Sequence, residues 1–254
     1  MASLYAAKAR LGRRGVLARA ADVVWPPRSL LSERVLDRPG VIEPELWAKL
    51  RFLSDPLCAR CGFPLPQDEG VGSVCGPCAA DPPVYERARA ALAYDDLAAT
   101  LVLDLKRGGR RDGLTAFARW MASAAAPLIA DADLLVPAPM HWTRLAARTF
   151  NQAAWLAQAL AREAGKAWSP SALVRVKRRQ SQAGLSASER RRNVAGAFRA
   201  RRQEVAGKAV LLVDDVLTTG ATGEACARAL RKAGAARVDI ATLARVVRPI
   251  DVSI

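Results

Sequence analysis

Two neighbouring carboxylates and a hydroxyl-rich turn form the most distinctive motif of the chain. The stretch VLLVDDVLTTGAT spans residues 210–222 and places Asp214 and Asp215 directly after four apolar residues. Two threonines, a glycine and a third threonine follow, and a predicted helix starts near Thr222. Backbone N–H groups at a helix N-terminus bind anions, and the helix dipole favours a phosphate there. The acidic pair can accept hydrogen bonds from hydroxyl groups or share a metal ion.

The motif therefore offers acceptors for hydroxyl groups on one side and donors for a phosphate on the other, which matches a ribose 5-phosphate. Gly220 lets the backbone approach a ligand closely, and three threonines add hydroxyl donors. Because the predicted strand 208–215 ends at the acidic pair, we expect Asp214 and Asp215 to escape burial.

Four cysteines form a second chemical motif, with the pairs Cys58-x₂-Cys61 and Cys75-x₂-Cys78 separated by 13 residues. This spacing is typical of a tetrahedral zinc site with four thiolate ligands. The glycines in CARCG and CGPC stand where such knuckles need unusual dihedral angles. The alternative is two disulfides or free thiols, but disulfides require an oxidising compartment and no stretch of the sequence indicates export. We expect one structural zinc ion, since four thiolates leave no open coordination position.

The elements that must position these motifs alternate along the chain. Apolar patterns predict strands over 87–96, 132–140, 208–215 and 237–247, and helices over 97–109, 113–130, 151–165 and 222–235. Apolar strands alternating with helices indicate a parallel sheet covered on both faces, with ligands beyond the carboxyl ends of the strands. Residues 176–192 fit no apolar period, which predicts either a flexible functional loop or disorder.

The charge of the chain is unevenly placed. The net charge is +15, and residues 141–208 carry 15 Lys and Arg but only three Asp and Glu. Such an excess favours polyanions or phosphate-bearing ligands, although an arginine-rich composition alone can also give a basic surface. Residues 1–24 form a basic extension whose composition also fits a transit peptide. Without a run of 18 apolar residues, we expect no membrane insertion and a cytoplasmic location.

The motif at 210–222 closely resembles the phosphoribosyl pyrophosphate (PRPP) motif of type I phosphoribosyltransferases. Together with VPAP (136–139), RTFNQAAWLAQAL (148–160) and SQAGLSASERRRNVAGAF (181–198), it resembles the ComF family, the competence protein F-like branch of that fold. The resemblance implies an α/β fold: a Rossmann-like type I phosphoribosyltransferase domain with a parallel sheet over 84–250, preceded by a small cysteine-rich zinc-ribbon module over 25–83, of which 58–78 is intact.

The same resemblance implies roles for individual residues. Asp214 and Asp215 would hold the ribose hydroxyls, partly through Mg²⁺. The residues that would wrap the 5-phosphate are Thr218, Thr219, Gly220, Ala221 and Thr222. The turn 137–144 would be the pyrophosphate loop, with Pro137 at its start and Arg144 as its cation. The flexible loop would close over the site and neutralise the leaving pyrophosphate through Lys177, Arg178, Arg179 and Arg190.

Members of this family often carry two tandem cysteine knuckle sets, and here the first set is degenerate. Ser29-x₂-Ser32 and Glu43-x₂-Leu46 keep the two-residue spacing without a cysteine. We therefore predict at most one zinc ion per chain, the alternative being that these are ordinary loop residues.

Two functions compete at this stage. The first is an enzyme that binds PRPP with Mg²⁺ and transfers the ribosyl phosphate to an unknown acceptor, with a role in DNA uptake and natural transformation. The second is a non-catalytic protein on the same fold, which binds single-stranded DNA within the DNA-uptake machinery through its basic segment, or which senses PRPP.

Overall fold

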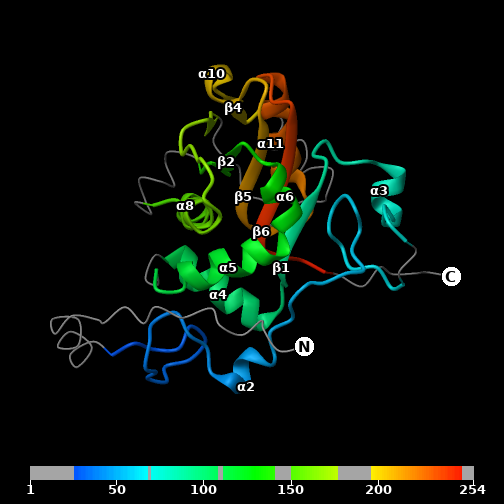
Figure 1. Ribbon diagram of the computed structural model, residues 1–254. Helices are drawn as coiled ribbons and strands as arrows, with labels where there is room; N and C mark the ends of the chain where they lie inside the picture. Colours follow the sequence, from blue (N-terminus) through cyan, green and yellow to red (C-terminus); the bar gives the residue numbers. More distant parts are fainter. Residues whose placement is uncertain (1–25, 68–69, 108–110, 141–149, 177–195, 248–254) are drawn as a thin grey trace, which may run out of the picture.

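A four-stranded parallel sheet forms the centre of the molecule. The computed structural model describes residues 26–67, 70–107, 111–140, 150–176 and 196–247 (Figure 1). The strands are β1 (Ala88–Ala93), β2 (Leu134–Pro137), β5 (Ala209–Leu217) and β6 (Arg237–Arg245), in the order β1-β6-β5-β2. All three pairings are parallel, which confirms the predicted α/β class.

Helices cover both faces of this sheet. The first face packs against α4 (Asp96–Arg107), α5 (Leu114–Ala124) and α8 (Gln152–Ala164), and Figure 1 shows α4, α5 and α8 on one side of the strands. The second face packs against α11 (Ala221–Lys232) and a short antiparallel pair, β3 (Leu173–Arg175) and β4 (Phe198–Ala200). Successive residues of β5 alternate between the two cores, as the two-residue period of a strand requires.

The structure departs from the predicted elements in three places. The predicted helix 113–130 divides into α5 and α6 (Ala126–Asp131), because Pro127 in the first turn of α6 has no N–H to continue α5. The short strands β3 and β4 and the helix α10 (Arg202–Val205) were not predicted. Strand β5 also continues two residues past the acidic pair, to Leu217. No helix among the described residues is long and apolar enough to cross a membrane.

Residues 26–55 pack against the main core. Leu30, Ile42 and Leu50 are buried in the same cluster as α4 and α5, and the N–H of Leu53 donates to the Ala91 carbonyl at 2.9 Å. Helix α2 (Pro44–Trp47) lies below α4 in Figure 1, whereas α3 (Gly76–Ala80) lies to the right of the sheet with the cysteine loops. The two halves of the N-terminal region therefore contact different parts of the domain.

A hydrogen-bonded cluster occupies the position of the degenerate knuckle set. The hydroxyls of Ser29 and Ser32 donate to the two carboxylate oxygens of Glu43. Burial raises the pKa of Glu43, but the two hydroxyl donors outweigh this effect and hold the pKa below its ordinary value. Leu46, the fourth residue of the set, packs against the main core. Hydrogen bonds from two serines to one glutamate therefore close this loop without a cysteine.

The cysteine loops rest on strand β1 at one glycine. Gly62 has φ +67°, and a Cβ added there would lie 2.5 Å from the Ala88 carbonyl oxygen. The second knuckle glycine differs from expectation: Gly76 has no positive φ because it begins α3. The need for an unusual dihedral angle therefore holds for CARCG and not for CGPC.

We predict that Gly62→Ala lowers the free energy of unfolding by about 3 kcal/mol, because it adds a steric clash to the cost of a left-handed conformation, which is about 1 kcal/mol. Gly72→Ala is the matched control, since Gly72 also has a positive φ (+92°) but has nothing within 4 Å of the added Cβ. Urea denaturation of both variants measures the difference. Equal losses in the two variants would show that the close approach to Ala88 is not a constraint.

Candidate functional site

The acidic pair lies beside the end of strand β2. Val213 pairs with Pro137 in the parallel register, and the N–H of Ala138 donates to the Val213 carbonyl at 2.8 Å. Asp214 follows at the carboxyl edge of the sheet, where the turn after β2 also begins. The structure thus brings together the start of the predicted pyrophosphate loop and the predicted ribose-binding residues.

The turn after β5 leads directly into α11. Gly220 caps the helix with φ +81°, and the first helical residue is Ala221. A small cavity of about 40 Å³ opens at this point, and its lining includes Asp214, Thr218, Gly220 and Thr222. A carboxylate and the N-terminus of a 12-residue helix therefore share one cavity.

Asp215 is buried, contrary to the expectation that both carboxylates escape burial. Its side chain accepts a hydrogen bond from Gln152 Nε2 at 2.9 Å and lies 3.3 Å from Lys106 Nζ. The expectation fails because β5 pairs with β6 beyond the acidic pair, so the strand does not stop there. Sequence reasoning missed Lys106 and Gln152 as site residues, although Gln152 stands out as a polar residue buried in the first turn of an apolar helix.

The surroundings of Asp214 disfavour the charged form of its carboxyl group. Burial raises the pKa of its carboxyl above the ordinary value, and the neighbouring charge of Asp215 adds to the effect. The N–H of Asp215 donates to Asp214 Oδ1 at 2.8 Å and partly offsets it. A carboxylate in this state favours a ligand that brings hydroxyl donors or positive charge.

Asn151 links α8 to the turn after β2. Its Oδ1 accepts from the Ala153 N–H at 3.0 Å and caps the helix, while its Nδ2 donates to the Ala138 carbonyl at 3.1 Å. The adjacent residue Gln152 contacts Asp215. The last two residues of the RTFNQ stretch, Asn151 and Gln152, thus fix the start of the turn after β2 and the acidic pair relative to one helix.

The remaining predicted cations lie outside the described residues. They are Arg144 of the predicted pyrophosphate loop and the four cations of the predicted flexible loop, Lys177, Arg178, Arg179 and Arg190. The described strands β3 and β4 flank the latter segment.

The four predicted metal ligands form one buried cluster. The Sγ atoms of Cys58, Cys61, Cys75 and Cys78 all lie within 4.8 Å of one another, and all five cysteines of the chain are free thiols. The Cys61 and Cys75 sulfurs are 3.6 Å apart. A tetrahedral zinc site has sulfur–sulfur edges of about 3.8 Å, whereas a disulfide needs about 2.05 Å. The geometry fits a metal and not two disulfides.

Backbone donors favour the thiolate form of one ligand. Burial alone would raise the pKa of Cys58, but the N–H groups of Cys75 and Cys61 point at its sulfur, at 3.3 and 3.5 Å, and help to lower the pKa to about 7. Burial raises the pKa of Cys61 to about 11. A cation bound between the sulfurs would lower the pKa of Cys61, because a coordinated thiol is deprotonated.

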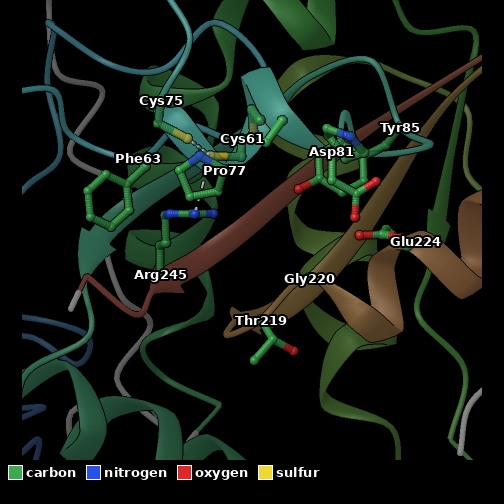
Figure 2. Close-up of a pocket in the computed structure, with 13 residues that line it drawn as sticks. Cys61, Phe63, Cys75, Pro77, Asp81, Tyr85, Thr219, Gly220, Glu224 and Arg245 are labelled. Atoms are coloured by element: carbon green, nitrogen blue, oxygen red, sulfur yellow. Dashed lines mark hydrogen bonds between the residues drawn. The ribbon is translucent and has the colours of Figure 1, made fainter. Parts of the chain in front are cut away.

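Arg245 connects the cysteine cluster to the end of strand β6. Its side chain is only 9% exposed, its Nη2 donates to Cys61 Sγ at 3.4 Å, and its guanidinium lies 5.5 Å from the centre of the Phe63 ring (Figure 2). Among the described residues, its Nε has no hydrogen-bond partner. A buried cation against the sulfurs suits a cluster of negatively charged thiolates.

Comparison with known proteins gives relatives for most of the chain. Residues 151–250 match the phosphoribosyl transferase domain model. The DNA utilization protein YhgH of Salmonella typhi is 35% identical over 198 residues, which cover 74% of this chain and 84% of that protein. Competence protein ComFC of Bacillus subtilis is 29% identical over 206 residues, covering 78% and 81%.

Competence protein F of Haemophilus influenzae is 36% identical over 115 residues, covering 44% of this chain and 50% of that protein. These matches, the parallel sheet and the buried cysteine cluster agree with one another. The chain therefore belongs to the ComF family of competence and DNA utilization proteins, with a phosphoribosyltransferase fold and a four-cysteine cluster in its N-terminal region.

Proposed function

We propose that the protein binds PRPP with Mg²⁺ at the carboxyl edge of the sheet and transfers the ribosyl phosphate to an acceptor. One observation carries this proposal: Asp214 lines a cavity at the N-terminus of α11 together with Thr218, Gly220 and Thr222. This arrangement supports the binding of a ribose 5-phosphate, because donors for a phosphate lie next to an acceptor for hydroxyls.

Each part of the site has a defined task in this proposal. The N–H groups of the first turn of α11 and the threonine hydroxyls hold the 5-phosphate. Lys106 and Gln152 bind the Asp215 carboxylate and hold it in place. The acidic pair can then accept hydrogen bonds from the ribose hydroxyls without moving. Carboxylate oxygens suit Mg²⁺, which when bound neutralises charge on the leaving pyrophosphate.

The chain's cations complete the site for group transfer. As the bond between C1′ and the pyrophosphate breaks, positive charge develops on the ribose and negative charge on the leaving group. The carboxylates of Asp214 and Asp215 stabilise the first charge. We assign the negative charge of the leaving group to Arg144 and to the cations of the predicted flexible loop, residues 176–192. Closure of that loop would exclude water from the reacting centre.

We predict that PRPP titrated with Mg²⁺ binds the wild type and that Asp214→Asn/Asp215→Asn lowers the affinity at least 100-fold, measured by calorimetry. The reason is the loss of two charged acceptors, each of which contributes about 1.5–3 kcal/mol. Asp104→Asn on α4 is the matched control and keeps the affinity.

Thermal melting without ligand shows whether the double variant is folded. We expect only a small change in stability, because the substitution removes the cost of burying the Asp214 charge and its repulsion by Asp215, but also the ion pair between Asp215 and Lys106. Failure of a folded wild type to bind PRPP would exclude the proposed site.

We also propose that the four cysteines hold one structural zinc ion. Among the described residues, the cluster around them contains two further apolar side chains, Phe63 and Leu65. A module with so small a core needs another source of stability, and zinc bound to four thiolates provides it. Four ligands leave zinc no open position for substrate.

We predict one zinc ion per purified chain by elemental analysis, and a loss of that zinc in Cys75→Ser. Cys226→Ala is the matched control: this cysteine is equally buried but lies on α11 in a separate apolar cluster, so zinc content stays at one. Zinc in both variants, or in neither, would contradict the assignment of ligands.

A second function is supported by a basic groove. A groove of about 600 Å³ lies between α11 and the β3–β4 pair, with four arginine and lysine residues along an apolar floor: Arg199, Arg202, Arg228 and Lys232. Cations beside an apolar floor can bind the phosphates and bases of single-stranded DNA. Several relatives carry names that refer to DNA utilization or competence. We propose that the groove binds single-stranded DNA during DNA uptake.

We predict that Arg199→Gln/Arg228→Gln/Lys232→Gln weakens binding of a 30-nucleotide single strand at least tenfold at 0.1 M salt. The slope of log affinity against log salt should fall by about 2, since each lost phosphate contact contributes about 0.7. Fluorescence anisotropy over a salt series measures both quantities. Arg38→Gln/Lys49→Gln/Arg51→Gln removes the same charge from the N-terminal region. An equal loss in both triple variants would show that net charge, and not the groove, binds DNA.

A further inference from the structure

Three planar side chains lie together at the start of helix α8. The rings of Phe150 and Trp155 are nearly parallel, with centroids 4.3 Å apart and an angle of 8° between their planes. The Arg111 guanidinium lies over the Trp155 ring, 4.0 Å from its centroid. Both aromatic side chains are half-buried, whereas Arg111 is exposed. The aromatic pair therefore supports a positive charge at the surface of the protein.

The packing of α5 against α8 places this charge at one end of the sheet. Arg111 precedes α5 and contacts Trp155 near the start of α8, whereas Arg119 in the middle of α5 lies 3.7 Å from Glu163 near the end of α8. Both pairs show that the two helices run in the same general direction, and Figure 1 shows them next to each other. The start of α5 therefore lies beside the start of α8.

Contacts along α8 connect Arg111 to the acidic pair. Gln152 begins α8 and donates to Asp215 Oδ2 at 2.9 Å. Trp155 follows three residues later on the helix, where side chains are neighbours with Cβ atoms about 5–6 Å apart. Lys106, which lies 3.3 Å from the same Asp215 oxygen, precedes Arg111 by only five residues. Arg111 therefore lies near the carboxyl edge of the sheet, on the side of α4 and α8.

The Arg111 guanidinium has no acidic partner in the described part of the chain. It forms neither a hydrogen bond nor an ion pair there, whereas Lys106 is paired with Asp215 and Arg119 with Glu163. Stacking uses the flat face of a guanidinium and leaves the N–H groups at its edge available. These N–H groups form a rigid fork that matches two oxygens of a phosphate. The stacked Arg111 is therefore suited to bind a phosphate group.

The position of Arg111 indicates which phosphate group this is. The proposed 5-phosphate site lies at the N-terminus of α11, which covers the opposite face of the sheet from α8. Arg111 lies instead near the turn after β2, because Asn151 Nδ2 at the start of α8 donates to the Ala138 carbonyl at 3.1 Å. The predicted pyrophosphate loop begins in that turn, at Pro137. Arg111 is therefore on the pyrophosphate side of the proposed site.

We propose that Arg111, held flat against Trp155, binds the pyrophosphate group of PRPP. This role rests on the proposed PRPP binding and names a cation for the leaving group within the described residues. In the transfer, the acceptor supplies the electron pair of the new bond to C1′. The bond from C1′ to the pyrophosphate oxygen breaks, and pyrophosphate leaves with that electron pair beside the Arg111 guanidinium. Trp155 is a positioning residue, since it fixes the plane of the guanidinium without contacting pyrophosphate.

Calorimetric titration of the full-length chain with three probes tests the binding role. The probes are pyrophosphate with Mg²⁺, PRPP with Mg²⁺, and ribose 5-phosphate. We expect Arg111→Gln to weaken pyrophosphate and PRPP binding at least tenfold, while the affinity for ribose 5-phosphate changes less than twofold. Arg111→Lys should lose less than Arg111→Gln, because it keeps the charge but not the fork. Arg119→Gln is the matched control, which removes the same charge from α5 and keeps all three affinities.

A double-variant cycle tests the positioning role of Trp155. Trp155→Leu alone should weaken pyrophosphate binding at least threefold. In the Arg111→Gln background the same substitution should cause no further loss, because no guanidinium remains to be held. Additive losses would show that Trp155 acts through the packing of α8 and not through Arg111.

The possible outcomes distinguish this role from the proposed function. Unchanged pyrophosphate affinity in Arg111→Gln, an equal loss in Arg119→Gln, or an equal loss of ribose 5-phosphate binding would overturn the role of Arg111 and leave PRPP binding by the wild type standing. Arg111-dependent binding of pyrophosphate to a wild type that does not bind PRPP would keep the phosphate site and exclude the transferase proposal. A wild type that binds neither pyrophosphate nor PRPP would overturn both.

Discussion

The burial of one carboxylate at the end of β5 is the constraint on which the site depends. Moving a charge out of water costs several kcal/mol unless a partner compensates, and Asp215 obtains its partners from two helices, α4 and α8. Lys106 and Gln152 can reach the same oxygen only if both helices pack on the same face of the sheet. The packing of α4 and α8 on one face of the sheet therefore also brings both partners to the Asp215 carboxylate. Asp214 receives only the N–H of Asp215 and a smaller attraction from Lys106 among the described residues, and its pKa stays raised. The ligand-free protein therefore gives up stability at this point, as ligand sites often do.

A second charge, that of Arg245, joins the cysteine loops to the sheet. Arg245 is the last residue of β6, and its guanidinium donates a hydrogen bond to Cys61 Sγ. A buried contact therefore links the sulfur cluster to the carboxyl edge of the sheet. Zinc held by four thiolates carries a net negative charge, which would balance Arg245 without any carboxylate. The cysteine cluster and the sheet edge are therefore joined by a charged contact, although none of the four cysteines comes from the sheet.

The sequence allows the order of the elements and the two motifs to be predicted, because these depend on local patterns. Apolar runs define β2, β5 and β6, and the DDVLTTGAT register places the phosphate turn. The partners of Asp215 could not be predicted in the same way, since Lys106 lies more than 100 residues away and only packing brings it close. The end of β5 was misplaced because acidic residues usually end apolar strands, whereas here pairing of Val216 with Ala244 continues the ladder. The strands β3 and β4 are too short, at three residues each, to give a periodic signal.

The two halves of the N-terminal region are held in place in different ways. Residues 26–55 place Leu30, Ile42 and Leu50 in the main core, so their loop can close with hydrogen bonds from Ser29 and Ser32 to Glu43. In the described part of the cysteine loops, the buried cluster consists of the four cysteines with Phe63 and Leu65 packed against them. Hydrogen bonds alone contribute about 1 kcal/mol each and could not replace that missing burial. A loop that hydrophobic packing already fixes can therefore close without cysteines, whereas a metal held by the four sulfurs would supply the stability that the packing of the cysteine loops does not.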